Sequence, residues 1–161
     1  MSAPRFVPDE PLPRYAYVPG RSPHPVSDPA GHSYNAPRPR PAPPDPDDWA
    51  GCREYLYGID LFNRGYYWEA HEVWEGLWKA AGRRGETADF LKGLIQLAVA
   101  GLKQRQGLPQ VAQAHARRAA ELWRGVAQER LLGFTVAALA DLAEAAERDG
   151  WPAPPPVLLP S

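Results

Sequence analysis

Apolar side chains recur every three or four positions through the middle of the chain. Tyr55, Ile59 and Phe62 are spaced i, i+4 and i+7, so they fall on one side of an α-helix. The same spacing returns in later segments. It predicts helices at residues 46–64, 66–81, 87–106, 109–128 and 136–148. Since no segment alternates as a strand does, the predicted fold class is all-α: a compact bundle of about five helices preceded by a proline-rich extended arm.

The third predicted helix is apolar on almost every side along its middle, FLKGLIQLAVAGL, which is typical of a central, buried helix. Gly93 and Gly101 lie inside it and cost roughly 1 kcal/mol each relative to alanine. We expect them to make room for bulky side chains of a neighbouring helix. Gln96 lies in the same buried segment and must find a hydrogen-bond partner.

The residues at the expected ends of the first helix support its bounds. Asp45 is suited to cap the N-terminus, and Pro46 suits the first helical position. Gly65 is suited to the left-handed conformation that often follows a helix. A helix from residue 46 to residue 64 is therefore expected.

Proline divides the chain into three parts. Fourteen of the 20 prolines lie in the first 46 residues and five in the last ten. Proline fixes φ and removes a hydrogen-bond donor, so these ends cannot form regular helices. The predicted organisation is an arm at 1–46, a helical domain at 47–150 and a proline-rich tail at 151–161. Because residues 14–35 hold three tyrosines and two of the four histidines, we expect the arm to lie partly on the helical body.

Charge and composition argue against several classes of function. The net charge of −1 lacks the basic footprint of a nucleic-acid-binding domain. A single cysteine, Cys52, cannot form an intramolecular disulfide and fits a reducing compartment. The first ten residues lack the basic and apolar regions of a secretory signal, and no apolar run is long enough to span a membrane. We therefore expect a cytoplasmic protein with no membrane partner.

The candidate chemistry lies in the second predicted helix, which begins YYWEAHEVWEGLW. His71, Glu75 and Trp78 are spaced i, i+4 and i+7, so they share one stripe at the margin of the buried face. Glu69 and Glu72 fall on the side expected to face water.

A histidine and a carboxylate at i and i+4 can both reach one metal ion. Two ligands are too few for a stable site, and His24 or His32 of the arm could supply more. Nitrogen and oxygen ligands suit Zn²⁺, Fe²⁺, Mn²⁺ or Ni²⁺ without choosing between them. The hypothesis is a divalent-metal site on His71, Glu75 and the two arm histidines, with no reaction assigned.

Four further residues are expected around that site. Asn63 and Gln96 could donate oxygens or orient the ligands. Trp74 and Trp78 would line the pocket and exclude water.

Two other interpretations remain open at this point. His71 and Glu75 could be a hydrogen-bonded core network completed by Gln96, in a non-catalytic helical module that binds a protein or a small ligand. Nucleic-acid binding through exposed arginines is a weaker third reading. The sequence is compatible with a homo-oligomer and does not name a partner.

Several motifs together resemble the domain of unknown function 309 family, whose members are small helical proteins of bacteria and archaea. They are NRG at 63–65, EAHEVWEGLW at 69–78 and FLKGLIQLA at 90–98. The likeness covers roughly residues 54–120, and the arm elements at 19–32 are similar to those of bacterial members. The resemblance implies a compact helical bundle and a His-x-x-x-Glu-x-x-aromatic pattern suggested to bind metal. That pattern is present here as His71, Glu75 and Trp78.

Overall fold

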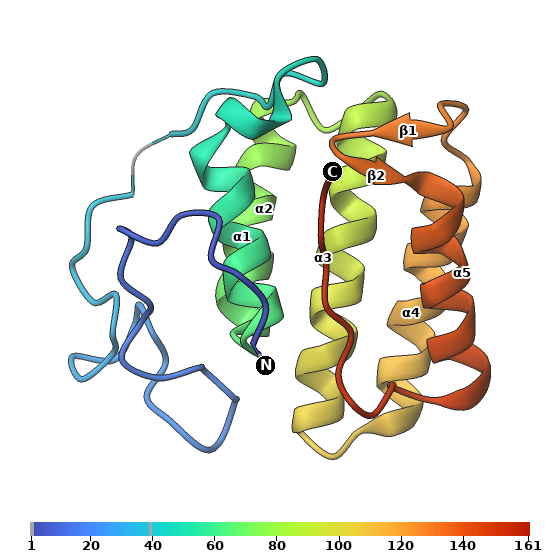
Figure 1. The fold of residues 1–161 in the computed structure, drawn as a ribbon. Helices are drawn as coiled ribbons and strands as arrows, with labels where there is room; N and C mark the ends of the chain where they lie inside the picture. The colour runs from blue at the N-terminus through green and yellow to red at the C-terminus, as the bar shows by residue number, and fades with distance from the viewer. Residues whose placement is uncertain (1, 39) are drawn as a thin grey trace.

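In the described part of the chain, five α-helices run up and down in chain order, each packed against the next (Figure 1). The computed structural model describes residues 2–38 and 40–161. The helices are α1 (Arg53–Asn63), α2 (Tyr67–Ala80), α3 (Glu86–Arg105), α4 (Pro109–Arg124) and α5 (Val136–Asp149). The all-α prediction is confirmed. No helix among these residues is long and apolar enough to cross a membrane.

The central position of α3 follows from its sequence, which is apolar on almost every side. It packs against α2 on one side and α4 on the other, and Phe90, Leu94 and Leu97 have no exposed surface. A Cβ at Gly93 would lie 2.3 Å from the Trp123 indole, so only glycine lets α3 and α4 approach this closely. The expected role of this glycine is confirmed.

The first helix begins later than its sequence suggests. Asp45 accepts the N–H of Asp47 through Oδ1 at 2.9 Å, which closes a local turn and does not cap a helix. A 3-10 turn, η1 (Trp49–Gly51), follows, and the extended backbone of Cys52 separates it from α1.

A short hairpin between α4 and α5 was not expected from the sequence. Its strands are β1 (Arg130–Leu131) and β2 (Phe134–Thr135), which pair in antiparallel register. Leu132 and Gly133 form the turn with φ of 50° and 85°. Positive φ at both positions is usual for two-residue hairpins, but leucine rarely adopts it. Tertiary contacts favour it here, because Leu132 is buried and its carbonyl accepts the Tyr55 hydroxyl at 2.7 Å.

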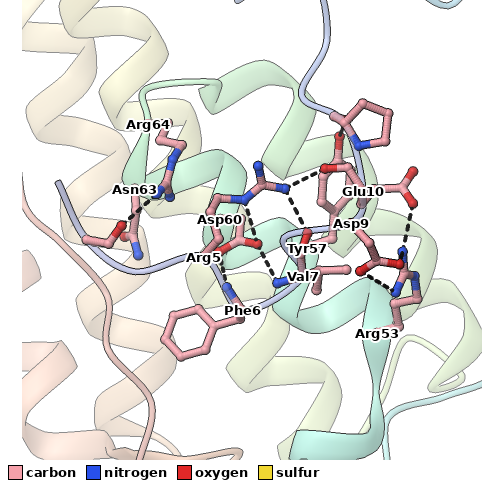
Figure 2. Close-up of polar contacts among 12 residues, drawn as sticks. Arg5, Phe6, Val7, Asp9, Glu10, Arg53, Tyr57, Asp60, Asn63 and Arg64 are labelled. Atoms are coloured by element: carbon pink, nitrogen blue, oxygen red, sulfur yellow. Dashed lines mark hydrogen bonds and ion pairs between the residues drawn. The ribbon is translucent and has the colours of Figure 1, made fainter.

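The start of the arm is fastened to α1 by a buried carboxylate (Figure 2). Asp60 has no exposed surface, and it accepts the backbone N–H groups of Phe6 and Val7 at 2.8 Å each. The guanidinium of Arg5 completes the set at 3.1 Å. A buried carboxylate needs such partners, so the segment around Arg5 is held at a defined place on the helical body.

The rest of the arm passes along the side of α1 and α2 that faces away from α4 and α5 (Figure 1). The Tyr57 hydroxyl of α1 donates to the carbonyl of Pro11 at 2.8 Å. Partial burial of that phenol raises its pKa to about 12. Arm and helices together enclose the region described next.

Candidate functional site

Helix α2 presents its polar side chains to the arm and its apolar ones to the core. Tyr67, Ala70, Trp74 and Leu77 are buried at spacings of three and four residues. The opposite side takes part in two separate histidine–glutamate pairs, one within α2 and one that joins α2 to the arm.

The first pair lies within α2 and forms part of an acidic cluster. His71 Nε2 lies 3.5 Å from Glu75 Oε2 and 3.7 Å from Glu72 Oε1. One ligand atom from each of these three residues lies within 4.8 Å of the others. Their side chains are 20%, 39% and 33% exposed for His71, Glu72 and Glu75, so solvent ions can reach the cluster.

The hydrogen bond on the other ring nitrogen determines the tautomer of a neutral His71. Nδ1 lies 2.9 Å from the carbonyl oxygen of Trp68. A carbonyl oxygen can only accept, so Nδ1 carries the hydrogen and donates it. In the neutral ring, Nε2 is then left with a free lone pair that points toward the glutamates. Histidines that bind metal are commonly oriented in this way.

Glu75 has a competing partner on its own helix. The ammonium nitrogen of Lys79 lies 3.3 Å from Glu75 Oε1, the oxygen that does not face His71. The carboxylate can thus keep this ion pair through one oxygen while the other remains directed at His71.

The second pair joins the arm to α2 and is buried. His32 Nε2 lies 2.6 Å from Glu69 Oε2, and the side chains are only 3% and 5% exposed. The same oxygen accepts the backbone N–H of Tyr17 at 3.0 Å. The expectation that Glu69 faces water was wrong. The arm covers the part of this face around Glu69, whereas Glu72 on the same side stays partly exposed.

His32 is held on several sides. Its Nδ1 lies 2.7 Å from Ser33 Oγ, and its backbone N–H donates to the Tyr15 hydroxyl at 3.1 Å. The Tyr15 ring also packs against the imidazole, with the ring centroids 4.6 Å apart. Glu69 Oε1 is buried and finds no hydrogen-bond partner among the described residues.

The structure does not bring either arm histidine into the cluster with His71 and Glu75. His32 is engaged by Glu69. His24 accepts the backbone N–H groups of Val26 and Ser27 on Nδ1, both at 3.2 Å. Its ring packs against Tyr17 and Trp68, with the ring centroids 5.3 and 5.6 Å away, and the residue is exposed to solvent.

The two amides that were expected near His71 lie elsewhere. The side-chain amide of Asn63 accepts the backbone N–H of Leu158 at 2.7 Å and donates to its carbonyl at 2.8 Å. These two bonds hold the C-terminal tail on α1. Gln96 Oε1 lies 2.7 Å from Nδ1 of His115, across the α3–α4 interface. Burial, and then the nearby Arg118, lower the pKa of that histidine.

The two tryptophans divide between core and surface. Trp74 is fully buried, and its indole N–H points to the carbonyl of Tyr55 at 3.4 Å. Trp78 lies under the ammonium of Lys92, which is 4.5 Å from the ring centroid. Neither indole walls off the His71 cluster from water, because that cluster is partly exposed.

An open cavity of about 890 Å³ lies between the arm and helices α1 and α2. Both clusters contribute to its lining, through Glu72 and Glu75 from one and through His32, Ser33 and Glu69 from the other. Apolar side chains and several cations complete the wall. They include Val26, Pro37, Arg38, Arg40, Tyr57, Trp68, Val73, Lys79 and Arg83.

Comparison with known proteins gives one result for this region. No curated protein and no solved structure matches the chain significantly. A family model described as "Domain of unknown function (DUF309)" matches residues 55–115, from the start of α1 to the middle of α4. This segment includes all of α2 and therefore His71, Glu72 and Glu75. Residues 55–115, which form the helical core of this chain from α1 to α4, are thus similar to the family described as domain of unknown function DUF309.

Proposed function

We propose that the protein binds a divalent metal ion through His71, Glu72 and Glu75. The observation that carries the proposal is the convergence of three ligand atoms, one from each residue, within 4.8 Å of one another. Two ligands about 2.0–2.2 Å from a tetrahedral ion lie roughly 3.3–3.6 Å apart. The separations from His71 Nε2, 3.5 and 3.7 Å, need little change to meet that requirement.

The state of His71 supports the same proposal. Its Nδ1–H donates to the Trp68 carbonyl, so Nε2 offers its lone pair without a change of tautomer. One imidazole and two carboxylates suit Zn²⁺, Fe²⁺, Mn²⁺ or Ni²⁺. Three protein ligands leave at least one coordination position for water or a ligand in the cavity.

The alternative of a structural core network is less favoured by the geometry. Such a network needs buried, mutually satisfied groups. His71 and Glu75 are partly exposed, and Gln96, which was to complete the network, bonds His115. We therefore expect His71 and Glu75 to contribute little to the free energy of unfolding when no ion is bound.

Isothermal titration of tag-free protein with Zn²⁺, and separately with Mn²⁺, tests the proposal. One ion should bind per chain, and His71→Ala or Glu75→Gln should weaken binding at least tenfold. Glu121→Gln is a matched control, because Glu121 is an exposed helical glutamate in an i, i+4 ion pair with Arg117. Binding that is unchanged by His71→Ala would refute the site.

The arm histidines are tested in the same titration. His24→Gln and His32→Gln should leave the affinity within threefold of the original protein. A larger loss in either variant would mean that an arm histidine completes the ligand set after a movement of the arm.

A further inference from the structure

A row of three hydrogen-bonded side chains lies on the arm side of the cavity. Ser33 Oγ, the His32 ring and the Glu69 carboxylate follow one another at 2.7 and 2.6 Å. All three residues line the cavity. The metal proposal uses none of them, so they form a separate candidate site.

The hydrogen positions follow from the partners. An ionised carboxylate only accepts, so His32 Nε2 carries the hydrogen that lies toward Glu69. The neutral ring then has its lone pair on Nδ1, which accepts the hydroxyl hydrogen of Ser33. This is the arrangement in which a base can take the proton of a serine nucleophile.

We infer that Ser33 is the nucleophile, and His32 the general base, of a carboxylic-ester hydrolase site in this cavity. Ser33 Oγ forms a bond to the ester carbonyl carbon while its proton passes to His32 Nδ1. The C–O bond to the alcohol then breaks, and the leaving oxygen takes the proton from Nδ1. Water attacks the acyl-serine, its proton passes through Nδ1 to Ser33 Oγ, and a carboxylic acid leaves.

Glu69 is the positioning residue in this scheme. Its carboxylate is 5% exposed and is oriented by the Tyr17 N–H. Because Oε1 has no partner among the described residues, the negative charge is incompletely compensated. An imidazolium formed next to this carboxylate is therefore stabilised when the serine proton moves.

The ring of His32 is also fixed in advance. Tyr15 packs on it and accepts its backbone N–H, while the Tyr15 hydroxyl donates to the Pro23 carbonyl at 2.6 Å. Fixing the base in this way lowers the entropy cost of reaching the reactive geometry.

The lining of the cavity indicates the class of ester. The volume of about 890 Å³ fits a small molecule. Val26, Pro37 and Val73 offer apolar contacts for an acyl chain. Arg38 places positive charge in the same space, where Lys79 is already paired with Glu75. Positive charge can stabilise the oxyanion that develops on the carbonyl oxygen. The expected substrate is an ester with an apolar acyl group.

Reaction of the whole protein with a fluorophosphonate probe tests the inference, because such probes phosphonylate activated serines. Peptide mapping by mass spectrometry should find one adduct, on Ser33. Ser33→Ala should abolish the adduct, and hydrolysis of p-nitrophenyl butyrate should fall to background. Ser27→Ala, at an exposed serine of the same arm, should change neither.

Two further variants separate catalysis from folding. His32→Ala should lower the labelling rate at least ~100-fold, and added imidazole should restore part of it, which a structural role alone would not produce. Glu69→Gln should lower the maximal labelling rate without changing the half-saturating probe concentration. Absence of an adduct on Ser33 in the original protein, or ester hydrolysis unchanged by Ser33→Ala, would overturn the inference.

Discussion

The two histidine–glutamate pairs of α2 differ in burial, in origin and in what they can do. His71 and Glu75 come from the same helix, lie 3.5 Å apart and are partly exposed. His32 and Glu69 come from segments 37 residues apart, lie 2.6 Å apart and are almost completely buried. In the neutral form of the first pair's histidine, Nε2 of His71 has a free lone pair that can bind an ion. The second pair holds the arm against the helix.

This difference teaches that the same two residue types contribute very differently to stability, depending on whether the pair is exposed or buried. An exposed i, i+4 pair is screened by water and stabilises a protein by less than about 1 kcal/mol. A buried pair has lost its hydration, so removal of one partner leaves an uncompensated polar group. Substitutions at the two pairs should therefore separate stability from ion binding.

The largest loss of stability is expected at the other buried carboxylate under the arm, Asp60. Asp60→Ala removes the acceptor of Phe6 N–H, Val7 N–H and Arg5. We expect the free energy of unfolding to fall by about 3–5 kcal/mol. Urea unfolding followed by circular dichroism measures it, with exposed Asp141→Ala as the control. A loss no larger than that of the control would show that the arm anchor contributes nothing.

A smaller loss is expected at the buried pair itself. Glu69→Gln keeps the shape of the side chain but removes the charge that His32 and Tyr17 share. We expect a loss of about 1.5–3 kcal/mol, the usual contribution of hydrogen bonds to a charged group. Amide hydrogen exchange at Tyr17 should accelerate. Unchanged exchange at this amide would mean that Glu69 does not hold the arm.

A still smaller effect is expected at the exposed pair when metal is absent. Glu75→Gln should change the free energy of unfolding by less than about 1 kcal/mol in chelator-treated protein. With saturating Zn²⁺, the original protein should gain thermal stability and the variant should gain much less. A large loss in chelator would instead favour the structural reading of His71 and Glu75.

The smallest effect concerns alkaline pH. The pKa of Tyr57 is about 12 in the folded protein, above its ordinary value of 10.0. Its contribution to stability is therefore complete below pH ~10 and is lost as the pH rises through about 12. The arm should loosen in that range, and absorbance at 295 nm should report the phenolate. Tyr57→Phe should remove this transition from the difference spectrum.

Most of the fold could be predicted from local pattern. The ends of α2 and α3 lie within about one residue of the periodicity-based bounds, because a helix that buries one face repeats its apolar positions every 3.6 residues. His71 and Glu75 could be found for the same reason. Their neighbour Glu72 was assigned to solvent, although its flexible side chain reaches the cluster.

The arm contacts could not be predicted in this way. A proline-rich segment has no helical or strand periodicity, so no local sequence pattern predicts that His32 will contact Glu69. The same limitation applies to Gln96. Its burial predicts that it has a hydrogen-bond partner, but that partner, His115, lies on another helix and could not be identified from local sequence. These contacts depend on tertiary packing between distant segments.

The central claim, that the exposed pair binds metal and the buried pair does not, is tested most directly by nitrogen-15 NMR of the histidine rings. On addition of Zn²⁺, His71 Nε2 should shift to the position of a coordinated nitrogen while Nδ1 stays protonated. The ring signals of His32 should remain unchanged, because its Nε2 stays hydrogen-bonded to Glu69. Coordination at His32, or no change at His71, would contradict the account.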